Sequence, residues 1–162
     1  MSVRVQVEDF DVGIELAKLR DVGMSATGSL VTFSGIVRDV ADNQTIKAMT
    51  LEHYPGMTLR ELEKIEAEAR ARWPLTASLI VHRHGRLEPG DNIVLVITAS
   101  AHRQAAFEAA EFLVDWLKTK APFWKQEATD SGHQWVSAKS TDAAAAARWR
   151  TPTELAPATK TG

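Results

Sequence analysis

Two lysines lie on either side of a short aromatic segment, Ala121-Pro122-Phe123-Trp124. Lys118 falls in the last turn of an expected helix, and Lys125 follows the bend that Pro122 imposes. Such a bend could bring both ammonium groups to one place and form a local cationic pocket. In the alternative interpretation, Lys118 only complements the helix dipole and pairs with Asp115, and Lys125 is an ordinary solvated lysine at a strand edge.

A second candidate site lies where an apolar strand runs into a helix, at Ser100-Ala101-His102-Arg103. The start of a helix offers free backbone N–H groups and a positive dipole, both of which favour a bound anion. His102 and Arg103 would add side-chain donors there. In the alternative interpretation, Ser100 is a purely structural N-cap.

Arg38 ends the expected strand that contains Phe33 and Gly35. A glycine within a strand often marks a bulge or the close approach of another group, so Arg38 either faces solvent beside a bulge or reaches a bound ligand. His82 and His84 share one strand face at a spacing that can hold a metal. No third His or Cys lies near them in sequence, so no metal site is expected.

The composition excludes several classes of protein. The chain has 162 residues and no cysteine, so a disulfide framework, a thiolate metal site and a cysteine nucleophile are all excluded. If the chain handles sulfur, the sulfur must arrive on another molecule. A net charge of −2 argues against a general nucleic-acid binder. Because neither a secretory signal nor a membrane-spanning apolar run is recognisable, a cytoplasmic location is expected.

Hydrophobic periodicity predicts the elements that must position these residues. Strands are expected over residues 3–7, 28–38, 45–54, 75–84, 93–99, 123–129 and 134–139, and helices over 11–21, 58–73, 101–120 and 143–149. The strands 28–38 and 45–54 are expected to form an antiparallel hairpin, a capping box at Thr58–Glu61 should start the second helix, and the apolar strand 93–99 should lie in the middle of a sheet.

Helices alternate with pairs of strands, which favours an α+β fold: a two-layer sandwich with a mostly antiparallel sheet. Residues 1–150 are expected to form one catalytic domain. Residues 151–162, rich in Thr, Pro, Ala and Lys, are expected to be a disordered tail.

Four motifs in the same order resemble the family of molybdopterin synthase catalytic (large) subunits. They are Phe33-x-Gly35-x-Val37-Arg38, Leu51-Glu52-His53-Tyr54-Pro55-Gly56-Met57, Ser100-Ala101-His102-Arg103 and Lys118-x-x-Ala121-Pro122-Phe123-Trp124-Lys125-x-Glu127. The resemblance covers roughly residues 3–150. It implies an α/β hammerhead-like fold and a homodimer that binds two small ubiquitin-like sulfur carriers, forming a heterotetramer.

The resemblance also implies the reaction. Sulfur would pass from a thiocarboxylate at the carrier's C-terminal Gly-Gly to cyclic pyranopterin monophosphate, forming the dithiolene of molybdopterin without a cofactor. Lys118 is expected to be the main catalytic residue, and Lys125 to hold the substrate or the carrier's terminal carbonyl. Arg38, His102 and Arg103 are expected to bind phosphate and pterin in one pocket, walled by Phe33 and Trp124. Lys139, which stands where the family often has arginine, is also expected to contact the substrate; it keeps the positive charge but not the two-pronged geometry of a guanidinium.

Two other classes of function remain open. A non-catalytic, dimeric small-ligand-binding α+β module would bind a pterin or nucleotide without turnover. A nucleic-acid-binding module would use the Lys118–Lys125 patch, but the neighbouring acidic residues Glu108, Glu111 and Asp115 would repel a phosphate backbone.

Overall fold

The computed structural model describes residues 2–22, 25–137 and 139–151. The helices in these ranges are α1 (Val12–Asp21), α2 (Met57–Arg72), α3 (Arg103–Thr119) and α4 (Ser140–Ala147). The strands are β1 (Val3–Gln6), β2 (Ser29–Ile36), β3 (Val40–Ala41), β4 (Gln44–His53), β5 (Leu75–Arg83), β6 (Gly85–Leu87), β7 (Asn92–Ser100), β8 (Phe123–Thr129) and β9 (Gly132–Val136). Each expected helix and strand has a counterpart, while β3 and β6 are short additions. Residues 152–162 of the expected tail lie outside the described ranges.

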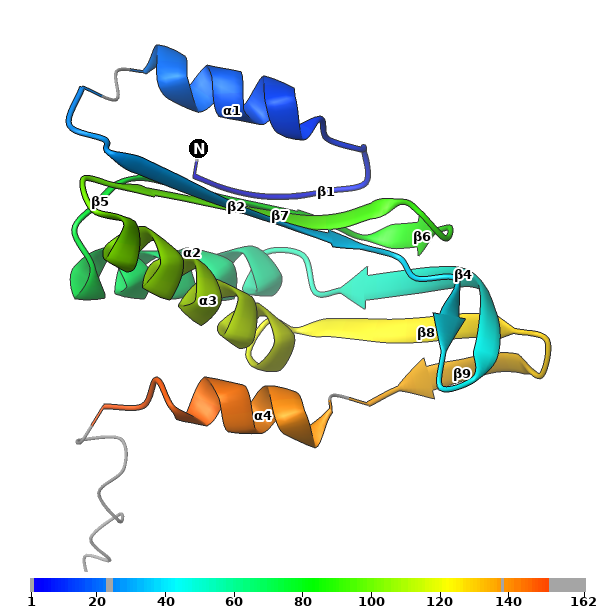
Figure 1. The fold of residues 1–162 in the computed structure, drawn as a ribbon. Coiled ribbons are helices and arrows are strands. Elements are labelled where there is room, and N and C mark those ends of the chain that lie inside the picture. The colour runs from blue at the N-terminus through cyan, green and yellow to red at the C-terminus, as the bar shows by residue number, and fades with distance from the viewer. Residues whose placement is uncertain (1, 23–24, 138, 152–162) are drawn as a thin grey trace, which may run out of the picture.

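The first sheet has the strand order β1-β5-β7-β2, in which only the β1–β5 pair is parallel. The apolar strand β7 lies inside the sheet, as its composition predicted. Alternation along β5 divides its side chains between two cores: Leu79 and Val81 pack towards α1, whereas Ile80 packs with α2 and α3. Figure 1 shows α1 on one side of this sheet and α2 and α3 on the other.

The second sheet joins β3, β4, β8 and β9, with β6 also paired to β4, and its pairs are antiparallel. It extends from one end of the first sheet, and α4 returns from it to pack against α3 (Figure 1). The α+β class with mostly antiparallel pairing is confirmed. None of the helices in the described ranges combines the length and the apolar character needed to cross a bilayer.

The predicted hairpin between 28–38 and 45–54 is wrong. β2 pairs with β7, and its register shifts between Gly35 and Ile36, where the chain leaves the first sheet. The hairpin that does form joins β4 to the two-residue strand β3. Asp42 and Asn43 make its turn with φ values of 49° and 62°, the left-handed conformation that two-residue hairpin turns require.

Two predicted helix caps are also wrong, because neither Thr58 nor Ser100 occupies the N-cap position and each hydroxyl donates to a distant carbonyl. α2 follows Gly56 without a side-chain cap, and the buried Thr58 hydroxyl donates to the carbonyl of Pro122 at 3.3 Å. α3 begins after His102, and the Ser100 hydroxyl donates to the carbonyl of Pro74 at 2.9 Å. The Ser100 oxygen also accepts from the backbone N–H of His102 at 3.5 Å. Both residues therefore attach a helix start to a distant segment.

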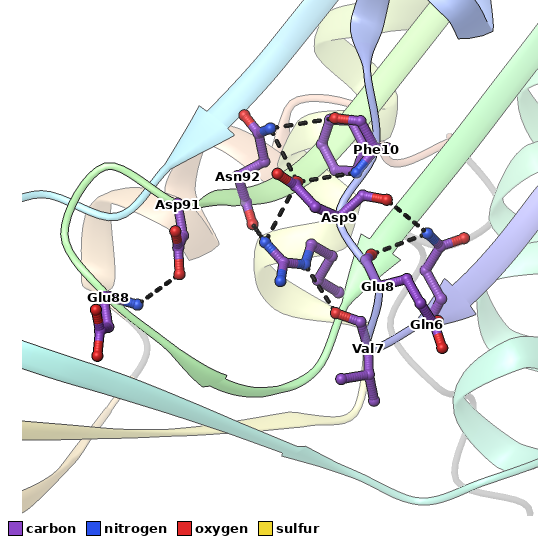
Figure 2. Close-up of polar contacts among 9 residues, drawn as sticks. Gln6, Val7, Glu8, Asp9, Phe10, Glu88, Asp91 and Asn92 are labelled. Atoms are coloured by element: carbon purple, nitrogen blue, oxygen red, sulfur yellow. Dashed lines mark hydrogen bonds and ion pairs between the residues drawn. The ribbon is translucent and has the colours of Figure 1, made fainter.

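The segment after β1 is held to the first sheet by Arg83 (Figure 2). Its guanidinium donates to the carbonyls of Val7 and Asn92, each at 3.0 Å, and pairs with the Asp9 carboxylate at 3.3 Å. The Asn92 side chain donates to the same carboxylate at 3.0 Å, and this hydrogen bond is the main reason that the pKa of Asp9 is lowered. The network positions the start of β7, which leads towards the candidate site.

Phe123 joins the two sheets, since its ring packs against the apolar clusters of both. The His82 ring stacks on it, with 3.8 Å between ring centroids and 16° between ring planes. His82 is buried, and this burial lowers the pKa of its imidazole to about 4. The joint between the sheets therefore contains a neutral histidine.

We expect this buried histidine to make stability depend on pH. An unfolded chain protonates histidine below about pH 6.5, whereas folded His82 stays neutral down to about 4. The unfolded state therefore binds one more proton in this window, and the free energy of unfolding should fall by about 1.4 kcal/mol per pH unit as the pH drops from 6.5 towards 4. Urea titrations across this range would measure the slope.

His82→Phe should make this slope shallower, because phenylalanine cannot be protonated. His133→Phe is the matched control, because it replaces an exposed histidine on β9 by the same residue. Equal slopes in wild type and His82→Phe would contradict the account.

Candidate functional site

A cavity of about 590 Å³ opens between the two sheets, at the end of α3. The side chains that line it come from the end of β2 and the loop after it, from β4, β5 and β7, from α3, and from β8, β9 and the segment leading to α4. They include Phe33, Val37, Arg38, Met49, Leu51, His82, Leu117, Lys118, Phe123, Lys125, Glu127, Ser137, Lys139 and Asp142. Segments far apart in sequence therefore meet at this one place.

Lys118 and Lys125 both line the cavity, as the bend between them suggested. α3 ends at Thr119, and β8 starts at Phe123 after Pro122. The alternative interpretation of Lys118 required an ion pair with Asp115. That carboxylate instead accepts from the Arg148 guanidinium at 2.9 Å and the Trp149 indole at 2.6 Å, and Lys118 makes no ion pair with any described residue.

Glu127 is a site residue that the sequence analysis did not assign. Its buried carboxylate pairs with the Lys125 ammonium at 2.9 Å, and Lys125 is itself only about one third exposed (35%). The sequence could have indicated Glu127, because residues two apart in a strand lie on the same face and Glu127 is two residues after Lys125. The pair holds the Lys125 ammonium at the cavity wall, so Lys125 is not an ordinary solvated lysine.

The opposite face of β8 carries Trp124. Its ring meets Tyr54 edge-on, with centroids 4.5 Å apart, and is 41% exposed. The expectation that Trp124 walls the pocket is therefore wrong, since alternation turns it away from Lys125. Phe33 does line the cavity, as expected.

Gly35 shows why the cavity can form beside β2. A Cβ added to it would lie 2.8 Å from the Cγ1 of Val94 and 3.6 Å from the Phe33 ring, so a larger residue would disturb this wall. The bulge at Gly35 precedes Arg38, which lines the cavity rather than facing solvent alone. Lys139, from the segment between β9 and α4, lines it as well.

His102 and Arg103 lie elsewhere, in a separate hollow of about 400 Å³ at the start of α3. Its other lining residues are Gly28, Ser29, Ala101 and Gln104. Gly28 permits a close backbone approach there, because a Cβ on it would meet the carbonyl oxygen of Ala101 at 2.3 Å. Both His102 and Arg103 are exposed.

The cavity with Lys118 and the hollow with Arg103 lie at opposite ends of α3. Arg103 opens α3 and Lys118 lies in its last turn, and at 1.5 Å per residue this separation is about 22 Å. The expectation that Arg38, His102 and Arg103 share one pocket is therefore wrong within a single chain. Helix propensity predicted α3 correctly but did not indicate that its two ends serve different hollows.

The charges of the cavity favour an anionic ligand. Four of its side chains are cations and two are carboxylates: Arg38, Lys118, Lys125 and Lys139 against Glu127 and Asp142. Arg38, Lys118 and Lys139 make no ion pair with a described residue, so their positive charge is available to a ligand. Low-polarity walls such as Phe33 and Leu117 would strengthen that attraction.

Comparison with known proteins agrees with the resemblance seen in the motifs. The family model described as "MoaE protein" matches residues 5–120. A molybdopterin synthase catalytic subunit from Mesorhizobium japonicum is 52% identical over an alignment of 155 residues that covers 94% of this chain and 96% of that protein.

Solved structures share the fold. The molybdopterin biosynthesis MoaE protein from Burkholderia ambifaria is 52% identical, with a TM-score of 0.77 over 92% of this chain and 98% of its own. A complex of subunits 1 and 2 of molybdopterin-converting factor from Helicobacter pylori is 21% identical, has a TM-score of 0.70 and covers 86% of this chain and 92% of its own. By family model and by identity over nearly its whole length, the chain belongs to the MoaE protein family.

Proposed function

We propose that this chain transfers sulfur from the thiocarboxylated C-terminus of a small carrier protein to cyclic pyranopterin monophosphate, forming the molybdopterin dithiolene. Its relatives are molybdopterin synthase catalytic subunits, and the chain has their role in molybdenum cofactor biosynthesis. The observation that carries the proposal is that Lys118 and Lys125 line one cationic cavity. We further propose that the reaction takes place in the cytoplasm.

The chemistry of both reactants suits this cavity. The precursor carries a phosphate and the donor is an anionic chain end, and both are stabilised by ammonium and guanidinium groups. Because the chain has no cysteine, it has no thiol with which to supply or relay sulfur. The sulfur atom of the carrier's thiocarboxylate would therefore attack a carbon of the precursor directly, and an oxygen substituent of that carbon would leave. Water would then cleave the acyl–sulfur bond of the resulting thioester, leaving the sulfur on the pterin and a carboxylate on the carrier.

The two lysines differ in their surroundings, and we assign them different roles. Lys118 has no ion-pair partner among the described residues, so it is free to transfer a proton and to stabilise charge as sulfur attacks. Lys125 is held by Glu127 and would bind the substrate or the carrier's terminal carbonyl. Arg38 would bind the phosphate or the pterin, Phe33 would exclude water, and Lys139 would add charge at the rim.

His102 and Arg103 would complete the site from a second copy of the chain. β2 is an edge strand of the first sheet, and Leu30, Phe33 and Ile36 on it are exposed. Such an apolar, unpaired edge is a template for pairing with another strand. Beside it α3 exposes Phe107, which extends the apolar surface.

Antiparallel pairing of two copies of β2 about a twofold axis would place the start of one strand beside the end of the other. The start of β2 adjoins the hollow with His102, and its end leads to Arg38 in the cavity. The homodimer would thereby bring the hollow of one protomer to the cavity of its partner. In this arrangement His102 and Arg103 would bind phosphate and pterin at the cavity of the partner protomer.

The reaction itself can be tested with purified components. Product should form from cyclic pyranopterin monophosphate only when the carrier ends in a thiocarboxylate; a plain carboxylate or a carrier without its last glycine should support none. Saturable precursor binding without turnover would instead favour a non-catalytic ligand-binding module. Comparable product formation from free sulfide would contradict the two-protein reaction.

Substitutions should separate the roles of the two lysines. Lys118→Ala should slow turnover roughly 10²–10⁴-fold, as expected for loss of a proton-transfer group. Lys118→Arg should stay nearly as slow, because a guanidinium does not release its proton near neutral pH. Lys125→Ala should mainly weaken substrate or carrier binding, and Lys125→Arg should recover much of that loss. Steady-state kinetics would measure each effect.

Thermal melts provide the control for folding. Lys118 is exposed, so its substitutions should cost no more than about 0.5 kcal/mol of stability. Lys125→Ala should cost more, because it leaves the buried Glu127 carboxylate without its ammonium partner, whereas Lys125→Arg keeps a positive charge there. Full activity of Lys118→Arg would leave electrostatic stabilisation as its role and remove proton transfer. Full activity of Lys118→Ala would place the active site elsewhere.

Mixed dimers test whether the site is shared. Lys118→Ala and Arg103→Ala should each be nearly inactive as homodimers. A mixed dimer would combine one doubly altered site with one intact site, so random mixing of equal amounts should restore about one quarter of wild-type activity. If each chain carried its own complete site, mixing would restore nothing.

A further inference from the structure

His82 is a buried member of the cavity wall to which neither the resemblance nor the charge pattern assigns a role. It lies near the end of β5, on the side of the first sheet that faces the cavity, and is 7% exposed. Its Nδ1 lies 2.8 Å from the carbonyl oxygen of Arg83. Since a carbonyl only accepts, Nδ1 carries the hydrogen, and this bond fixes both the tautomer and the orientation of the ring.

The face of this oriented ring lies against Phe123, at 3.8 Å between centroids and 16° between planes. Phe123 is the residue at which the chain turns into β8, and its backbone N–H donates to the carbonyl of Ala121 at 2.8 Å across the bend. The opposing residue on β4 is His53. The flat face of His82 therefore supports the first residue of the strand that carries Lys125.

Lys125 and Glu127 follow Phe123 on the same face of β8. Their ion pair, 2.9 Å long, joins two residues of the same strand. It would stay intact if the whole strand moved, so it does not determine the position of Lys125 relative to Lys118. β8 is positioned by its pairing with β4 and by contacts with the first sheet. The Phe123–His82 stack is such a contact, and it lies two residues from Lys125.

The other titratable groups around the stack do not replace it. His53 lies 6.1 Å from Phe123 between ring centroids, tilted by 31°, and His84 contacts His53 at 4.2 Å. Both histidines disfavour a proton on His82 through charge repulsion.

We propose that His82 is a positioning residue for Lys125: by stacking on Phe123, its oriented ring sets where β8 begins and hence where the Lys125 ammonium stands in the cavity. The inference rests on the proposed function only for its kinetic consequence. The structural consequence, a fixed Lys125, holds whatever reaction the cavity performs.

Two substitutions of His82 separate the flat face from the ring nitrogens. His82→Phe keeps a flat ring but lacks both ring nitrogens. His82→Leu has a side chain of similar size that lacks both the nitrogens and the flat face. His84→Leu is the matched control, because His84 belongs to the same group of histidines but contacts His53 rather than Phe123. Thermal melts of the full-length variants establish that each is folded.

The first measurement needs no substrate. An amine-acylating reagent is applied briefly, and the rate of modification of Lys125 is compared by mass spectrometry with that of Lys64 on α2, an exposed lysine that does not line the cavity. We expect the relative rate at Lys125 to change several-fold in His82→Leu and to stay near wild type in His82→Phe and His84→Leu. An unchanged rate in His82→Leu would overturn the proposal.

The second measurement is steady-state turnover with thiocarboxylated carrier. His82→Leu should raise KM for the precursor or for the carrier several-fold with kcat less changed, as in Lys125→Ala, because the misplaced ammonium is the one assigned to binding. His82→Phe should restore KM to near wild type. Equal increases of KM in both variants would mean that the nitrogens act rather than the stack, and would also overturn the proposal.

The two readouts distinguish this inference from the proposed function. If the wild-type chain forms no product, the proposed reaction fails, while the labelling of Lys125 still decides whether His82 positions it. If His82→Leu does not fold, Phe123→Leu removes the same stack from the other side and is judged by the same labelling result.

Discussion

The stack of His82 on Phe123 is the contact on which the geometry of the candidate site depends. Phe123 belongs to the apolar clusters of both sheets, so it determines how the second sheet extends from the first. The cavity lies between those sheets, and its two lysines stand before and after Phe123 in the chain. A histidine at this joint must stay neutral, which couples the packing of the core to pH.

The rest of the site depends on β2, which approaches neighbouring segments closely near both of its ends and whose outer edge is unpaired among the described residues. Gly28 and Gly35 stand near the two ends of β2, and at each a Cβ would collide with a neighbour. Between them runs the apolar edge strand β2, which pairs with β7 on one side and has no partner among the described residues on its outer side. The same strand thus separates the two candidate anion sites within one chain and offers the surface through which a second copy could reunite them.

Buried polar residues connect the distant parts. Thr58 and Ser100 both looked like helix caps in the sequence, yet each hydroxyl bonds to the carbonyl of a proline in another segment. Arg83 does the same on a larger scale by attaching the segment after β1 to the start of β7. A buried hydroxyl or guanidinium needs a partner, and a tertiary partner can replace the local one that sequence patterns suggest.

Local patterns in the sequence determined most helices and strands, the central position of β7 and the meeting of Lys118 with Lys125, because periodicity and a proline bend act over a few residues. The alternation of side chains along β5 and β8 also indicates that His82 and Glu127 face the cavity and that Trp124 faces away from it. Strand pairing was decided only by the tertiary structure: β2 pairs with β7 rather than β4. The distance of about 22 Å between Arg103 and Lys118 already follows from the predicted helix, but only the tertiary structure shows that its two ends line different hollows, because each hollow is closed by segments far away in sequence.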